Sequence, residues 1–317
     1  LLLRRGGEEA LRRSQPSQRR TVEHLHALEH VNIDGHKFDV FVKLPDGRVI
    51  RPIMVAIQDI YSRKLLSWRI GEAESAVLTR LAFADLFRDF GIPKACTLDN
   101  GRAFASKWIT GGAKNRFRFK IREEEPTGLL TGLGIRIHWA LPYRGQSKPI
   151  ERAFRDLCDT IAKHPAMEGA YTGNKPTAKP ENYGSRAVPM DRFVELVASG
   201  IAAHNARLGR RGGVARGRSF DEVFAESYAT APIGKATPVQ LRMALLAAEQ
   251  VTVDRRTGEV ALFGNRYWSD GCGPLHGQKV TVRFDPDNLH SEVHLYGGHD
   301  GRLLTTAGLL AAAGFND

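Results

Sequence analysis

The chain has 317 residues, which is enough for two domains of about 100–200 residues each. It carries 46 lysine and arginine residues against 35 aspartate and glutamate residues, so its formal net charge is +11. Hydrophobic residues make up 42% and charged residues 26%, which excludes a disordered, collagen-like or coiled-coil chain. No apolar run reaches the ~18 residues of a transmembrane helix, so no membrane partner is expected. The surplus of positive charge points to a polyanionic partner.

Cysteine usage and the N-terminal residues add two expectations. Cys96, Cys158 and Cys272 lie far apart and form no CxxC pair, which predicts neither a zinc knuckle nor a disulfide framework and fits a reducing cytoplasm. The chain begins with Leu rather than Met, so we interpret it as a fragment of a longer protein. Residues 1–25 contain arginine pairs among Gly, Ser and Pro, and we expect a basic linker or N-terminal extension there.

Residues 26–230 have the pattern of one α/β domain. Short runs of alternating or continuous apolar residues are joined by turn signals, and amphipathic stretches with helical spacing lie between them. This order of elements predicts a mixed sheet with helices packed on it. In chain order we expect strands at 31–34, 38–43, 52–57 and 65–70, a helix at 77–90, strands at 94–98 and 134–141, a helix from Pro149, and another at 191–205.

The C-terminal part reads differently. Ser219 with Glu222, and Thr237 with Gln240, have the spacing of helix capping boxes, and the second pair begins a connecting helix expected within 231–248. Residues 249–317 have an all-β composition with Gly- and Asn-containing turns, which predicts a small barrel domain. The expected strands are 251–253, 259–263, 279–284 and 291–296.

Three acidic residues are candidates for a metal site. Asp34 lies on the first predicted strand, Asp99 at the carboxyl end of the strand at 94–98, and Glu151 in the first turn of the helix from Pro149. If the two strands are neighbours, two carboxylates meet at one sheet edge and the helix can add the third. Such a cluster needs divalent metal to offset its own repulsion, and hard oxygen ligands select Mg²⁺ or Mn²⁺. Spacing alone leaves solvated surface acids as an alternative, and Asp59, which also follows an apolar strand, competes.

Several motifs carry a family resemblance from about residue 30 to about residue 305. Asp34, Asp99-Asn100-Gly101 and the helical Glu151 resemble the catalytic core of the DDE transposase and retroviral integrase superfamily, which has an RNase H-like fold. Other segments are more closely similar to the transposase family of phage Mu and its prophage relatives. Those segments are residues 108–113, 115–116, 148–154, 164–165, 169–173, 178–180, 182–184 and 282–286.

The resemblance implies a fold, a site and an activity. The fold is an RNase H-like mixed five-stranded sheet with flanking helices, followed by a small all-β barrel. Asp34, Asp99 and Glu151 are implied to be catalytic and to hold two Mg²⁺ or Mn²⁺ ions. The implied reactions are 3′-end cleavage of transposon DNA and strand transfer into target DNA, as in-line displacements that one ion pair can serve. Two alternatives remain: a nuclease of the same fold that only hydrolyses, and a DNA-binding assembly scaffold that has lost its chemistry.

The same resemblance implies partners. They are transposon-end DNA, target DNA, further copies of the chain in a multimeric synaptic complex, and a target-delivery ATPase that contacts residues outside this chain, all in the cytoplasm of a bacterial host. Cations near the predicted site are candidates for DNA contacts, either along a strictly alternating basic strand or around the helix from Pro149. A solvated basic face, or salt bridges to the acidic cluster, would explain them equally. These candidates are Arg116, Arg118, Lys120, Arg144, Lys148, Arg152 and Arg155.

Overall fold

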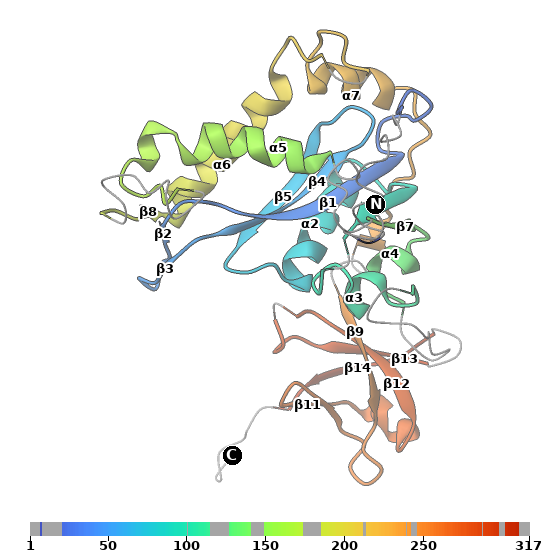
Figure 1. The fold of residues 1–317 in the computed structure, drawn as a ribbon. Coiled ribbons are helices and arrows are strands. Elements are labelled where there is room, and N and C mark those ends of the chain that lie inside the picture. The colour runs from blue at the N-terminus through green and yellow to red at the C-terminus, as the bar shows by residue number, and fades with distance from the viewer. Residues whose placement is uncertain are drawn as a thin grey trace.

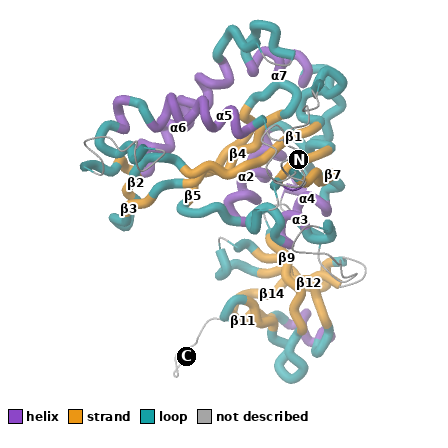
Figure 2. The backbone as a smooth tube through the Cα atoms, in the orientation of Figure 1, coloured by secondary structure: helices purple, strands orange, loops and turns teal. Residues whose placement is uncertain are grey.

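In a computed structural model, the chain forms an α/β part with an antiparallel barrel beside it (Figures 1 and 2). The two parts follow one another in the sequence, as the composition predicts. No helix in the described part of the chain is long and apolar enough to cross a membrane. The structure describes residues 7, 21–99, 101–114, 127–140, 149–173, 185–211, 214–238, 240–241, 246–286, 288–297 and 302–310.

The α/β part is built on one five-stranded sheet with the order β5-β4-β1-β6-β7. Strand β1 pairs antiparallel with β4 and parallel with β6; β4 pairs antiparallel with β5, and β6 pairs parallel with β7. This mixed sheet with flanking helices confirms the predicted RNase H-like fold. The strands are β1 (His30–Lys37), β4 (Ile53–Asp59), β5 (Leu65–Gly71), β6 (Ala95–Leu98) and β7 (Arg136–Trp139).

A small hairpin interrupts the predicted meander between β1 and β4. Its strands β2 (Val42–Lys43) and β3 (Val49–Ile50) pair with each other, and β2 also pairs in parallel with β8 (Val188–Pro189). The single strand expected at 38–43 is therefore wrong, because the chain leaves the main sheet after Lys37; within this range only Val42–Lys43 form a strand, and Val40 makes an isolated bridge to Tyr171.

Helices cover both faces of the main sheet, and the sheet separates two hydrophobic clusters. On one face, α2 (Ala76–Asp89) packs Phe83 and Phe87 against Val31 and Ile33 of β1. On the other face, α5 (Ile150–Leu157) and α6 (Met190–Ala206) enclose a second cluster. Shorter helices are α3 (Lys107–Thr110), α4 (Leu129–Gly132) and α7 (Phe220–Tyr228), and both predicted capping boxes are present.

The C-terminal part is an all-antiparallel, nearly closed barrel with the strand order β10-β11-β14-β13-β12-β9. The strands at Asn265–Trp268 and Leu303–Leu309 are absent from the sequence-based expectation. The first follows a tight turn at Gly264, so its pattern merges with that of the preceding strand. The second does not alternate cleanly between polar and apolar residues. The strands are β9 (Ala247–Thr252), β10 (Val260–Leu262), β11 (Asn265–Trp268), β12 (Lys279–Phe284), β13 (Val293–Gly297) and β14 (Leu303–Leu309).

Helix α3 joins the barrel to the α/β part. The Trp108 ring packs edge-on against Phe284 of the barrel core, with ring centroids 5.8 Å apart. Its Nε1 donates a hydrogen bond of 2.8 Å to Oε1 of Glu249 on β9, and Lys107 forms an ion pair with the same carboxylate. The barrel is thus held by the segment that follows Asp99.

Candidate active site

Two of the three predicted acids lie just beyond the paired residues of neighbouring parallel strands: Asp34 lies within β1 and Asp99 directly follows β6. The β1–β6 register runs as far as Asn32 opposite Thr97, and Asp34 and Asp99 each follow two residues later. Both side chains are partly exposed. The backbone N–H of Gly35 donates to Oδ1 of Asp34 at 3.0 Å. The turn after β6 therefore brings a second carboxylate next to the strand that carries the first.

The turn after Asp99 is held by its own carboxylate. The N–H of Gly101 donates to Oδ1 of Asp99 at 2.7 Å. A Cβ atom on Gly101 would lie only 2.7 Å from that oxygen, and 3.4 Å from Oε1 of Glu74. A Cβ on Gly35 would collide with Oε2 of the same Glu74 side chain. A side chain at either position would therefore displace a neighbouring carboxylate.

Glu74 is an acid of this region that sequence reasoning missed. It precedes Ser75, whose side chain accepts a hydrogen bond from Leu78 N–H and caps α2. Its carboxylate lies next to Gly35, which directly follows Asp34, and next to Gly101, which lies two residues after Asp99. Glu74 lies in a connecting loop with no periodic pattern, so no sequence signal could have identified it.

The third predicted acid lies on a different element. Glu151 is exposed in the first turn of α5, which buries Ile150, Ala153, Phe154 and Leu157 on its other side. Within the described residues, no three His, Cys, Asp or Glu side chains are close enough together to hold one metal ion. The structure thus brings Asp34 and Asp99 to equivalent positions beyond the β1–β6 pairing, but within the described residues it does not gather all three predicted ligands into one site.

The competing acid Asp59 has a structural role. Its side chain is fully buried, and it accepts hydrogen bonds from Leu28 N–H at 3.0 Å and from the N–H and hydroxyl of Ser62 at 2.7 and 2.6 Å. Burial raises the pKa of Asp59, and these donors act in the opposite direction. Asp59 holds the turn after β4 and is not available to a metal ion.

The α5-facing side of β1 is unusually polar. Along it, His30, Asn32, Asp34 and His36 alternate with the apolar residues of the opposite face. Burial lowers the pKa of His30 to about 4, and its Nε2 lies 2.8 Å from Oγ1 of Thr97. The carboxamide of Asn32 is completely buried, and neither of its polar atoms has a hydrogen-bond partner in the described structure.

His36 lies against helix α5. Its Nε2 is 2.6 Å from Sγ of Cys158. Burial lowers the pKa of His36 and raises the pKa of the Cys158 thiol to about 12, so both groups are neutral at pH 7. Neither belongs to a group of three His, Cys, Asp or Glu side chains that could hold a metal ion within the described residues.

The structure describes two of the seven predicted DNA-contacting cations. Arg152 and Arg155 are exposed on α5, on the side turned away from the sheet core. Burial lowers the pKa of Arg63, and the nearby positive charge of Arg152 lowers it further, whereas the charge of Asp59 raises it. The candidates Arg116, Arg118, Lys120, Arg144 and Lys148 lie outside the described residues.

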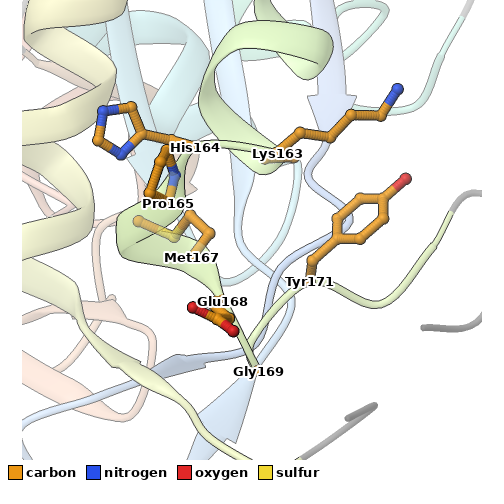
Figure 3. Close-up of a pocket in the computed structure, with 8 residues that line it drawn as sticks. Lys163, His164, Pro165, Met167, Glu168, Gly169 and Tyr171 are labelled. Atoms are coloured by element: carbon orange, nitrogen blue, oxygen red, sulfur yellow. The ribbon is translucent and has the colours of Figure 1, made fainter. Parts of the chain in front are cut away.

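A pocket of about 300 Å³ lies at the end of α5 remote from Glu151, lined by residues including Lys163, His164, Met167 and Tyr171 (Figure 3). It contains none of the three predicted acids. Met167 and the neighbouring Ala170 are completely buried in the second cluster. The motif segments at 164–165 and 169–173 therefore close that core rather than form the active site.

Comparison with known proteins identifies the family. The sequence profile of the bacteriophage Mu transposase matches residues 22–229, and that of the Mu transposase C-terminal domain matches residues 242–306. The chain belongs to the bacteriophage Mu transposase family. It is 36% identical over 333 aligned positions to the Mu-like prophage FluMu transposase A of Haemophilus influenzae. That alignment covers all of this chain and 48% of the relative, so the chain spans about half the length of that member of the Mu transposase family.

Among solved structures, retroviral integrases are similar to the chain at lower sequence identity. The catalytic core domain of BIV integrase is 20% identical, with a TM-score of 0.38, and the alignment covers 64% of this chain and 97% of that one. The simian T-cell lymphotropic virus intasome is 15% identical, with a TM-score of 0.43, and 87% of this chain and 84% of that one are covered.

Proposed function

We propose that the chain is the catalytic part of a DNA transposase that cleaves the 3′ ends of transposon or prophage DNA and joins them to target DNA by direct transesterification. Membership of the Mu transposase family supports this proposal. The single observation that carries it is the equivalent position of Asp34 and Asp99, each two residues beyond the last paired residues of the neighbouring parallel strands β1 and β6. A nuclease of the same fold that only hydrolyses is the second candidate, because the same carboxylates would serve hydrolysis.

The residues present fit a divalent cation. Asp34 and Asp99 supply hard oxygen donors from adjacent strands, and the glycines beside them leave space for carboxylates. We assign Asp34, Asp99 and Glu151 as the residues that would hold two Mg²⁺ or Mn²⁺ ions. When bound, such ions offset the negative charge at the reacting phosphate and favour deprotonation of the attacking oxygen.

The chain's own residues would act mainly by positioning. A backbone N–H donor orients each of the Asp34 and Asp99 carboxylates, which would help to position these ligands. Glu151 would approach the phosphate from the first turn of α5. Exposed cations on the same helix, Arg152 and Arg155, would contact the DNA backbone. The other predicted contacts are Arg116, Arg118, Lys120, Arg144 and Lys148.

Both proposed reactions are balanced displacements at phosphorus. In the first, the oxygen of water bonds to phosphorus while the bond to the 3′ oxygen of the transposon end breaks, and that oxygen takes up a proton. In the second, the new 3′-hydroxyl oxygen loses its proton and bonds to a target phosphorus, and a target 3′-hydroxyl leaves. Two transposon ends must meet one target, so we propose that the chain acts as a homo-oligomer in the host cytoplasm. Contact with a target-delivery ATPase would involve residues outside this chain.

The decisive experiment supplies a pre-cut 3′-hydroxyl DNA end and target DNA in Mg²⁺ or Mn²⁺. We expect the wild-type chain to give joined product, and Asp34→Asn or Asp99→Asn to lower its rate at least about 100-fold. Glu195→Gln, at an exposed acid on α6, is the matched control and should leave the rate unchanged. Hydrolysis without joining would favour the nuclease, and normal joining by Asp99→Asn would refute the assignment of Asp99.

A further inference from the structure

The contact between His36 and Cys158 ties α5 to the strand that carries Asp34. In addition to the 2.6 Å approach of Sγ to Nε2, the ring of Phe154 lies 5.2 Å from the His36 ring. Phe38 meets His36 edge-on at 5.3 Å. His36 is therefore held between the helix and the strand on both sides of its ring.

Cys158 occupies a special position on the helix. The buried side of α5 is otherwise apolar, formed by Ile150, Phe154 and Leu157. Cys158 is the first residue of a π-helical turn, Cys158–Ala162, that continues the α-helix. π-Helical turns are rare and are frequently found at functional sites. A neutral thiol can donate its proton to the unprotonated Nε2 of a neutral imidazole.

The two partners of the His36–Cys158 contact lie on the same elements as two of the proposed ligands. Asp34 precedes His36 by two residues on the same face of β1, a distance of about 6.6 Å along the strand. Glu151 precedes Cys158 by seven residues, which is two helical turns, so it projects from nearly the same side of the helix about 10.5 Å away. Each predicted ligand therefore shares a face with one partner of the contact.

The helix and the strand also run in the same direction. Near the start of α5, Arg152 is close enough to Arg63 for the two positive charges to repel each other. Arg63 lies just after the end of β4, where Asp59 pairs with Val31 near the start of β1. Beyond the end of α5, Tyr171 bridges to Val40, just past the last residue of β1. Figure 1 shows α5 lying along β1 in this orientation. From the His36–Cys158 contact, Asp34 and Glu151 are thus displaced in the same direction.

We propose that His36 and Cys158 are positioning residues that fix α5 along β1 and thereby set how closely the Glu151 carboxylate approaches Asp34 and the bound metal ions. This inference rests on the proposed role of Glu151 as the third ligand. Neither His36 nor Cys158 touches DNA or metal in the proposal, so both act through Glu151.

The test is a double-mutant cycle read out by Mn²⁺ binding. Calorimetry with the pre-cut DNA end and target duplex present should show Mn²⁺ affinity about 10-fold weaker in Cys158→Ala. Cys158→Ser, which keeps a hydroxyl donor, should restore most of the affinity. In a Glu151→Gln background, Cys158→Ala should have no further effect, because its influence runs through Glu151. Thr160→Ala, on the same turn but bonded only within its own helix, is the matched control and should bind Mn²⁺ normally.

A second variant protects the test against misfolding. His36→Phe keeps the ring contact with Phe154 and removes Nε2, so it should reproduce the loss in Cys158→Ala. An equal loss with and without Glu151, or a lowered melting temperature with unchanged Mn²⁺ affinity, would overturn the inference. Unchanged affinity in Glu151→Gln alone would overturn it as well. The proposed function fails separately, if Asp99→Asn still joins DNA at the normal rate.

Discussion

The two faces of strand β1 differ sharply. Towards α2 the strand presents Val31 and Ile33, both completely buried in an apolar cluster. Towards α5 it presents His30 and His36, which contact Thr97 and Cys158 of neighbouring elements, and Asp34, which accepts a hydrogen bond from Gly35 N–H. The apolar face contributes mainly to stability, and the polar face carries the proposed metal ligand. The sheet tolerates a polar face because the opposite face supplies the packing.

The largest effect is expected on the apolar face. Ile33→Ala removes methyl groups from the α2 cluster and should lower the free energy of unfolding by about 2–5 kcal/mol, since the cavity closes only partly. Denaturant unfolding monitored by circular dichroism measures this change. At a temperature where the variant is folded, Mn²⁺ affinity should equal that of the wild type. A loss of affinity would mean that the two faces are not independent.

A smaller effect is expected where the polar face meets the turn after β6. Gly101→Ala places a Cβ 2.7 Å from Oδ1 of Asp99, so the carboxylate must move. Strand transfer should fall about 10- to 100-fold, while overpacking lowers the free energy of unfolding by about 1–3 kcal/mol. Gly308→Ala, where an added Cβ meets no atom within 4 Å, serves as the control for glycine replacement. Equal activity of both variants would contradict the proposed role of Asp99.

The smallest effect concerns pH. Because burial lowers the pKa of His30 from 6.5 to about 4, the folded protein takes up the proton less readily than the unfolded chain. The contribution of neutral His30 to the free energy of unfolding is fully present above pH 6.5. It is lost as the pH falls towards 4, by less than about 1.4 kcal/mol per pH unit. His30→Asn should flatten the dependence of the melting temperature on pH in this window. An unchanged slope would mean that His30 is not the titrating group.

The sequence predicts well what depends on local pattern. The alternation in β1, the helical spacing of α2 and α5, and the capping box at Ser219 and Glu222 are all present in the structure. The pairing of Asp34 with Asp99 is conditional on their strands being neighbours, and the structure shows that β1 and β6 do pair in parallel.

Long-range features could not be predicted. The burial that makes Asp59 structural depends on Leu28, and the contact of His36 with Cys158 joins a strand to a helix 122 positions away. Glu74 lies in a loop, where no periodicity marks a residue. Each of these depends on tertiary packing rather than on spacing.

The attachment of the barrel has a mechanical consequence. Trp108 inserts its ring beside Phe284, and with Lys107 it holds Glu249, only a short stretch of chain after Asp99. The barrel is therefore anchored only a few residues from a proposed metal ligand. A partner that displaces the barrel would be expected to shift the segment that follows Asp99.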